Sequence, residues 1–131
     1  LEFRRVLFRS SVLVEDQQKA RDFYVETLGW RVKHDIDMGG PRWLTLTSPE
    51  GHDDVELLLE PMGFDEARDW QQVLKARGVP AAAFASSDID AEVDRLIARG
   101  VAFAGPVRSV GPTRIAMFDD TCGNLIQLFE R

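Results

Sequence analysis

The sequence predicts an α+β fold in which a single βαβββ unit is used twice. Landmarks of the first half recur about 71 residues later in the second half. The recurring pairs are the aspartates ahead of a helical pattern, the glycines that close it, the glycines ahead of the last strand and the polar residue within that strand: Asp16 and Asp88, Gly29 and Gly100, Gly51 and Gly123, Glu56 and Gln127. Because these pairs keep one register over most of the chain, we expect a binding site where the two copies meet.

The first unit, residues 11–61, reads as a strand, a helix and three further strands. Residues 11–14 form a short β-branched run, Asp16 can cap the helix that follows, and Gly29 can end it. One face of this helix is predicted to be buried, and it is made of Ala20, Phe23, Tyr24, Thr27 and Leu28. Turn residues then separate three predicted strands, at 30–36, 42–47 and 54–60.

A connecting segment, 62–79, and a second unit, 80–131, complete the predicted domain. The connection is predicted to form a helix from about 65 to 77 that buries one apolar side, made of Phe64, Trp70, Val73 and Leu74. The second unit repeats the first, with a helix that carries Val93, Leu96 and Ile97 and with strands at 81–86, 101–104, 113–118 and 124–129. We therefore expect residues 11–131 to form one domain.

The first ten residues differ in character from the rest of the chain. They contain Arg4, Arg5 and Arg9 and no initiator Met, in a protein that is otherwise acidic. The segment 1–10 resembles a translated vector or sequencing adapter, and we expect it to be non-native. A native basic leader is the alternative.

Composition excludes several classes of function. The net charge of −6 and the isoelectric point near 4.9 leave no basic stripe for nucleic acid. The longest apolar runs are strand-sized, well below the roughly 20 residues that span a bilayer. A lone cysteine, Cys122, forms no internal disulfide and suits a reducing compartment, so we expect a cytoplasmic protein.

Alternation along the predicted strands separates a core face from a mixed face. Leu44 and Leu46 suit the packing side of their strand, and Trp43 and Thr45 point the opposite way. The same pattern in the other strands predicts a mostly apolar cup wall with few polar anchors, as small-molecule sites usually have. The predicted substrate-binding residues are Trp43, Thr45, Glu56, Leu58, Ile115, Met117, Gln127 and Phe129.

Three groups of residues carry a resemblance to a known family. They are Val14-Glu15-Asp16 leading through Ala20, Phe23-Tyr24 and Leu28-Gly29, then Val55-Glu56-Leu57, and finally Asp119-Asp120 leading to Gly123-Asn124-Leu125-Ile126-Gln127-Leu128. With these motifs, residues 11–131 resemble the vicinal oxygen chelate superfamily, which includes glyoxalase I, bleomycin-resistance proteins, extradiol dioxygenases and fosfomycin-resistance enzymes. The resemblance implies a curved, cup-shaped mixed sheet with helices on the outside. It does not by itself imply an activity.

The resemblance also implies metal-ligand positions on the first and last strand of each unit, usually two His or Gln and two Glu. Carried over to this chain, the first-strand positions fall near Arg9 and about Ala82, and the last-strand positions fall on Glu56 and Gln127. Only Glu56 and Gln127 are oxygen donors, whereas a catalytic divalent ion needs three or more protein ligands. We therefore expect no cofactor. The alternative is a zinc, nickel, iron or manganese ion that is held by Glu56 and Gln127, with a native His in place of Arg9.

Several of these residues have a plainer structural interpretation. Glu56 can pair with a basic residue across the sheet, and Gln127 can hydrogen-bond across the cup. His34 is expected on a strand surface and His52 in a solvated loop, while Cys122 is expected to be structural. Trp43 is placed to stack on a planar ligand.

Two functions fit these features. The first is a homodimeric protein that sequesters a hydrophobic or aromatic compound in the manner of bleomycin-resistance proteins, without a complete metal site. The second is a metal-dependent lyase, isomerase or dioxygenase that acts on vicinal oxygens, with Glu56 as ligand and catalytic proton shuttle. The missing donors favour the first.

Overall fold

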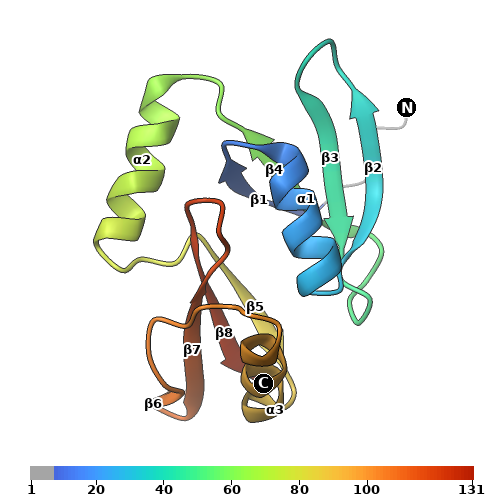
Figure 1. Ribbon diagram of the computed structural model, residues 1–131. Coiled ribbons are helices and arrows are strands. Elements are labelled where there is room, and N and C mark those ends of the chain that lie inside the picture. Colours follow the sequence, from blue (N-terminus) through green and yellow to red (C-terminus); the bar gives the residue numbers. More distant parts are fainter. Residues whose placement is uncertain (1–7) are drawn as a thin grey trace.

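The computed structural model describes residues 8–131, with eight strands, three α-helices and one π-helical turn in that part of the chain (Figure 1). The elements of the first unit are β1 (Phe8–Val14), α1 (Gln17–Asp22), η1 (Phe23–Thr27), β2 (Arg31–Asp37), β3 (Arg42–Thr47) and β4 (Val55–Pro61). The connection is α2 (Asp65–Ala76), and the second unit consists of β5 (Ala82–Ser86), α3 (Ile89–Ala98), β6 (Arg108–Val110), β7 (Thr113–Asp119) and β8 (Leu125–Glu130). No helix within residues 8–131 is long and apolar enough to cross a membrane.

The strands form two four-stranded mixed sheets with the same topology. Their orders are β1-β4-β3-β2 and β5-β8-β7-β6, and the two edge strands β1 and β5 adjoin each other. In each sheet the first strand of the unit runs parallel to the last, and the remaining pairs are antiparallel. The predicted α+β fold with two βαβββ units is therefore confirmed. β1 starts at Phe8, so it includes three residues of the segment 1–10.

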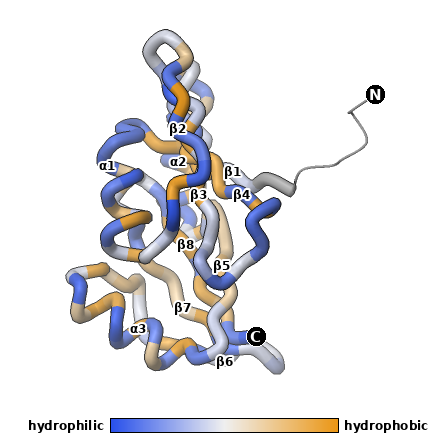
Figure 2. Tube along the Cα trace, turned by 90° about the vertical axis from the view of Figure 1, so that its right-hand side faces the viewer, coloured by the Kyte–Doolittle hydropathy of each residue, from blue (hydrophilic) through white to orange (hydrophobic). Residues whose placement is uncertain are grey.

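A single hydrophobic core joins the two sheets to the helices. α1 lies against the first sheet and α3 against the second (Figure 1). The alternation predicted for the strands is confirmed, because alternate residues of β3, β4, β7 and β8 belong to this core: Leu44, Leu46, Leu57, Leu59, Ala116, Phe118, Ile126 and Leu128. We call the opposite face of each sheet its cup face. The β2–β3 hairpin projects beyond the rest of the chain (Figure 2).

The first helix begins after Asp16 and ends before Gly29 as predicted, but it changes its hydrogen-bonding pattern part-way. Asp16 caps it as expected, through its carboxylate and the backbone N–H of Lys19 at 3.0 Å. After Asp22 the chain continues as the π-helical turn η1, with a hydrogen bond from Leu28 N–H to the Phe23 carbonyl. A π-turn inserts an extra residue and rotates the side chains that follow. Tyr24 lies in this turn and is fully buried.

The buried face predicted for the connecting helix α2 is wrong. Phe64, Trp70 and Val73 are 69%, 60% and 43% exposed, and the helix instead buries Ala67 and Gln71. The Gln71 amide donates hydrogen bonds to the carbonyls of Leu13 and Cys122. The helix therefore buries a polar side chain in place of its apolar stripe, because that side chain satisfies buried backbone carbonyls.

The strand predicted at 101–104 is also wrong. That segment makes one isolated bridge, between Phe103 and Phe118, and the second strand of the second unit is the short β6 instead. Gly105 and Pro106 directly follow the segment, and this Gly-Pro pair breaks the extended run before a full ladder forms.

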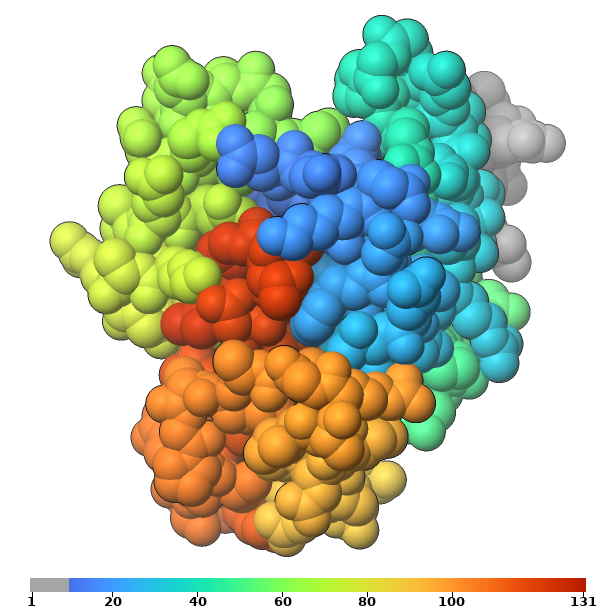
Figure 3. Space-filling view, viewed as in Figure 1, coloured from blue at the N-terminus to red at the C-terminus, as the bar shows by residue number. Residues whose placement is uncertain are grey.

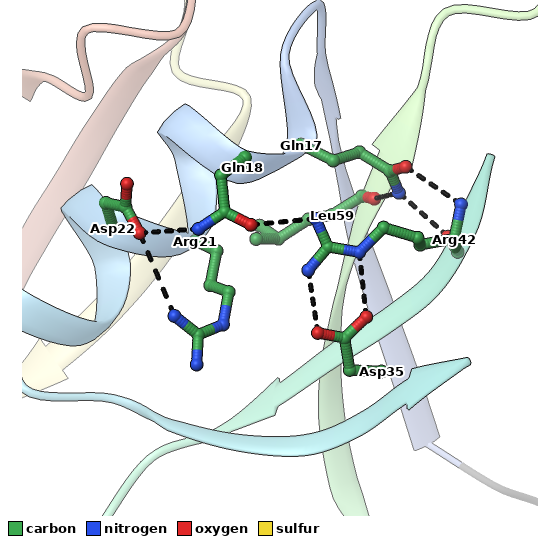
Figure 4. A network of polar contacts seen from close by, with 7 residues as sticks. All are labelled: Gln17, Gln18, Arg21, Asp22, Asp35, Arg42 and Leu59. Carbon is green, nitrogen blue, oxygen red and sulfur yellow. Dashed lines mark hydrogen bonds and ion pairs between the residues drawn. The ribbon is translucent and has the colours of Figure 1, made fainter. Parts of the chain in front are cut away.

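A glutamine of α1 holds the two central strands of the first sheet where their ladder opens. β3 and β4 pair only at Thr45–Leu58 and Leu46–Leu57. Beyond these pairs, Gln17 Nε2 donates to the carbonyls of Arg42 and Leu59 at 2.8 and 2.9 Å, and Gln17 Oε1 accepts from Arg42 N–H at 2.9 Å (Figure 4). The side chain thus replaces a missing rung of the sheet and fixes α1 on it.

Candidate functional site

The centre of the first cup face is a buried carboxylate with a hydroxyl partner. Glu56 in β4 and Thr45 in β3 are 7% and 0% exposed, and Thr45 Oγ1 donates to Glu56 Oε1 at 2.7 Å. Leu58, 5% exposed, lies opposite Thr45 in the ladder and shares this face. Among the described side chains this carboxylate accepts one neutral hydrogen bond, and it has capacity for a further donor.

A β-bulge brings His34 to the same face. The pairing of β2 with β3 shifts register between Val32 and His34, so that His34 lies opposite Thr45. Its Nε2 is 3.7 Å from Glu56 Oε1, and the imidazole is 45% exposed. Such a bulge turns the following side chain to the other face of the strand. The sequence analysis placed His34 on a strand surface but missed this neighbour, because simple alternation does not reveal a bulge.

The eight predicted site residues lie in two groups, one on each sheet. Trp43, Thr45, Glu56 and Leu58 belong to β3 and β4. Ile115, Met117, Gln127 and Phe129 belong to β7 and β8, where Ile115 pairs with Phe129 and Met117 with Gln127. Ile115 is buried, whereas the other three of this group are half-buried. The second cup face is therefore the more open of the two, and it is largely apolar.

A cleft of about 700 Å³ lies where β1 adjoins β5. Ser10 and Ser11 line one side and all of β5 lines the other, with Glu56 and Val55 of β4 beside them. Of the eight predicted residues, Glu56 alone lines this cleft within the described chain. The predicted loop residue His52 is exposed and lies at the same opening.

The two units are joined by a buried polar network that leaves no ligand position of its own. Asp120 is fully buried and accepts from Tyr24 Oη at 2.7 Å and from Asn124 Nδ2 at 2.9 Å, both at Oδ2. Its Oδ1 accepts the backbone N–H groups of Cys122 and Asn124 at 2.8 and 3.0 Å. Asn124 and Gln71 both donate to the carbonyl of Leu13, at the end of β1. In Figure 3 the red β7–β8 turn is wedged between the lime α2 and the blue α1.

Burial and the negative charge of Asp120 together raise the pKa of two neighbouring side chains. Burial, reinforced by the negative charge of Asp120, raises the pKa of Tyr24 well above its ordinary value. Burial first and Asp120 second raise the pKa of the Cys122 thiol to about 11. The thiol is therefore protonated at neutral pH, which agrees with the structural role expected for it.

Comparison with known proteins decides the family. The model of the Glyoxalase/Bleomycin resistance protein/Dioxygenase superfamily matches residues 6–128. The chain belongs to this superfamily. It is 44% identical over 122 residues to YurT, an uncharacterized protein of Bacillus subtilis (strain 168), and the match covers 93% of this chain and 96% of YurT.

Proteins with solved structures share the whole fold. TnmS3, an antibiotic binding protein from Streptomyces sp. CB03234, superposes with a TM-score of 0.72 at 32% identity, over 99% of this chain and 98% of TnmS3. UcmS2 superposes with a TM-score of 0.80 at 26% identity, over 97% and 98% of the two chains.

The metal positions that the superfamily implies are poorly equipped in this chain. The ladder pairs Glu56 with Arg9 and Gln127 with Ala83, so the first-strand position of the second unit is Ala83 and not Ala82 as predicted. Within residues 8–131 no group of three or more His, Cys, Asp or Glu side chains is placed to hold a metal ion. The donors at these positions do not fit the three-ligand minimum of a catalytic divalent site.

Proposed function

We propose that this protein binds a small, largely apolar or aromatic compound on its cup faces and does so without a complete metal site. The arrangement of Glu56 carries the proposal, because among the described residues its carboxylate accepts one hydrogen bond, from Thr45, and belongs to no cluster of three or more potential metal ligands. A carboxylate of this kind orients a ligand through one hydrogen bond while the apolar area supplies most of the affinity. The description of TnmS3 as an antibiotic binding protein, at 32% identity, supports a binding function.

Trp43 is the aromatic anchor of the proposal. It lies on the same face as Thr45, two residues along β3, and is half-buried. An indole on a face that also carries a buried carboxylate favours planar ligands with a hydrogen-bond donor or a positive charge at one edge.

Two substitutions test these roles. A screen of planar aromatic compounds by tryptophan fluorescence selects the tightest ligand, and titration calorimetry then compares the variants. Trp43→Ala is expected to weaken binding by about 1 to 3 kcal/mol, the loss of one aromatic anchor. Glu56→Gln keeps the shape and is expected to weaken cationic ligands while leaving neutral ones almost unchanged. Trp70→Ala, at an exposed position on α2, is the control. Unchanged affinity in both test variants contradicts the proposal.

One observation favours a second candidate, a metal-dependent lyase, isomerase or dioxygenase. His34 Nε2 lies 3.7 Å from Glu56 Oε1, and an imidazole beside a carboxylate is the start of a ligand set or an acid–base pair. Elemental analysis separates the two. Our proposal predicts well under one equivalent of zinc, nickel, iron or manganese after dialysis and a melting temperature unaffected by chelators. Stoichiometric metal favours the enzyme.

We also propose that the protein forms a homodimer in which the first unit of one chain completes a cup with the second unit of its partner. The open second cup face supports this, since Met117, Gln127 and Phe129 are only half-buried in the single chain. Apolar surface of this kind usually marks an interface. Light scattering at tens of micromolar is expected to show twice the chain mass of 14.8 kDa. A species of the single-chain mass alone contradicts the dimer.

A cytoplasmic location completes the proposal. Cys122 is the only cysteine and has no partner for an internal disulfide, which suits a reducing compartment. Fractionation of the producing cell, with detection by antibody, tests it.

A further inference from the structure

A second cleft, of about 430 Å³, opens on the helix side of the junction between the units. It adjoins the first cleft, because both are lined by the same seven residues: Trp30, Ser48, Glu50, Phe84, Ala85, Ser86 and Ser87. We call this shared strip the seam groove. It lies away from Trp43 and Thr45, which line neither cleft.

Two aromatic rings form the apolar part of the seam groove. The ring centroids of Trp30 and Phe84 are 4.8 Å apart at an interplanar angle of 47°. Both side chains are half-buried and pack on the hydrophobic core from one side, which leaves part of each ring toward the groove. Rings held in this way offer a preformed stacking surface, because little side-chain freedom is lost when a ligand binds.

The charges around the groove are mostly negative. Glu50, Asp88 and Glu92 line the helix-side cleft together with one cation, Arg95. The Arg95 guanidinium is already engaged by Glu92, to which its Nε and Nη2 both donate. Among residues 8–131, no hydrogen bond or ion pair engages the Glu50 carboxylate. The Glu50 carboxylate interacts with Arg95 through its charge alone. The groove therefore offers a negative charge that has no hydrogen-bond partner among residues 8–131, beside an aromatic surface.

We propose that the seam groove is a ligand site of its own, for a planar aromatic cation that stacks on Trp30 and is attracted by Glu50. Glu56 lines the adjoining first cleft but is not one of the seven residues of the groove, and Trp43 lines neither cleft, so this site does not depend on the function proposed above. Charge complementarity decides the kind of ligand. An aromatic cation is stabilised both by stacking on the rings and by attraction to the carboxylates, whereas an aromatic anion is stabilised by stacking alone.

Two dyes of opposite charge test the proposal on the whole protein. Thioflavin T is the planar cation and 1-anilinonaphthalene-8-sulfonate is the anion, and the fluorescence of each is titrated at low and high salt. We expect saturable binding of thioflavin T that weakens with added salt, and much weaker binding of the anion. Equal binding of both dyes overturns the proposal.

Substitutions then locate the dye. Trp30→Leu is expected to weaken thioflavin T binding by about 10-fold, whereas Trp70→Leu, at an exposed position on α2, leaves it unchanged. Glu50→Gln, in an exposed loop, is expected to weaken it by about 2- to 5-fold at low salt, with Glu66→Gln on the exposed surface of α2 as the charge-matched control. Glu50→Gln keeps the test decisive if Trp30→Leu fails to fold.

Loss of binding in Trp43→Leu but not in Trp30→Leu or Glu50→Gln assigns the dye to the cup face and overturns the proposal. Dye binding that falls as protein concentration rises shows that a second copy of the chain fills the groove, and it overturns the proposal too.

Discussion

Removing the Tyr24 hydroxyl tests the polar joint between the two units with a change of one oxygen atom. In Tyr24→Phe, Asp120 loses the 2.7 Å hydrogen bond at Oδ2 and keeps its three other donors. A hydrogen bond to a charged group contributes about 1.5 to 3 kcal/mol, and the remaining donors keep the carboxylate solvated, so we expect a loss of about 2 kcal/mol in the free energy of unfolding. For a chain of 131 residues this corresponds to a fall in melting temperature of about 7 °C.

Urea unfolding followed by circular dichroism measures the effect. The midpoint should fall while the m-value stays constant, because the surface exposed on unfolding is unchanged. Thr113→Val is the control, since it removes a longer, neutral hydrogen bond of 3.3 Å from Thr113 Oγ1 to the Glu130 carbonyl, and we expect it to cost less than about 1 kcal/mol. A loss in Tyr24→Phe no larger than in the control refutes the reasoning.

The raised pKa of Tyr24 adds an alkaline signature to the same variant. Above the ordinary tyrosine pKa the unfolded chain loses this proton while the folded chain keeps it, so the unfolded state binds fewer protons and stability falls as pH rises. The contribution is fully present below about pH 10 and is lost above it. Wild-type protein should therefore lose stability more steeply than Tyr24→Phe above that pH. Parallel pH profiles for the two proteins contradict the assignment.

Three further outcomes are expected from the same structure. Gln17→Ala should lower the free energy of unfolding by about 2 kcal/mol, because it frees buried backbone groups of β3 and β4, and urea unfolding measures it. Gly123→Ala should cost about 2 to 4 kcal/mol, since φ is +99° and the new Cβ would lie 2.6 Å from Gln71 Oε1; a cost below that of Gln17→Ala contradicts this. With a pKa near 11, Cys122 has about one thiolate in a thousand at pH 8, so a disulfide reagent should label it slowly in the folded protein and fast in urea.

Much of the fold was predictable because both repeat units express their pattern locally. The bounds of β3 agree with the predicted strand at 42–47, since turn residues flank it on both sides. Asp16 caps its helix as predicted, and Asp88, its counterpart in the repeat, caps the helix of the second unit, because the capping bond is made within three residues. Alternation likewise assigned Leu44 and Leu46 to the core.

The failures arise where a contact distant in sequence decides the outcome. Gln71 is buried because it bonds the carbonyl of Leu13, 58 residues away, and no helical pattern contains that information. His34 faces Glu56 only because a bulge in β2 shifts its register.

The joint at Asp120 has a consequence for how such a chain acquires new ligands. A tandem duplication must hold its copies at a set angle, and here polar side chains at the end of β1 and in the β7–β8 turn do so on the core side of the sheets. The side chains that fix this angle are not on the cup faces. If the cup faces bind the ligand as proposed, the half-buried Trp43, Met117 and Phe129 can be exchanged one at a time, and the ligand can change while the polar joint between the two halves stays intact.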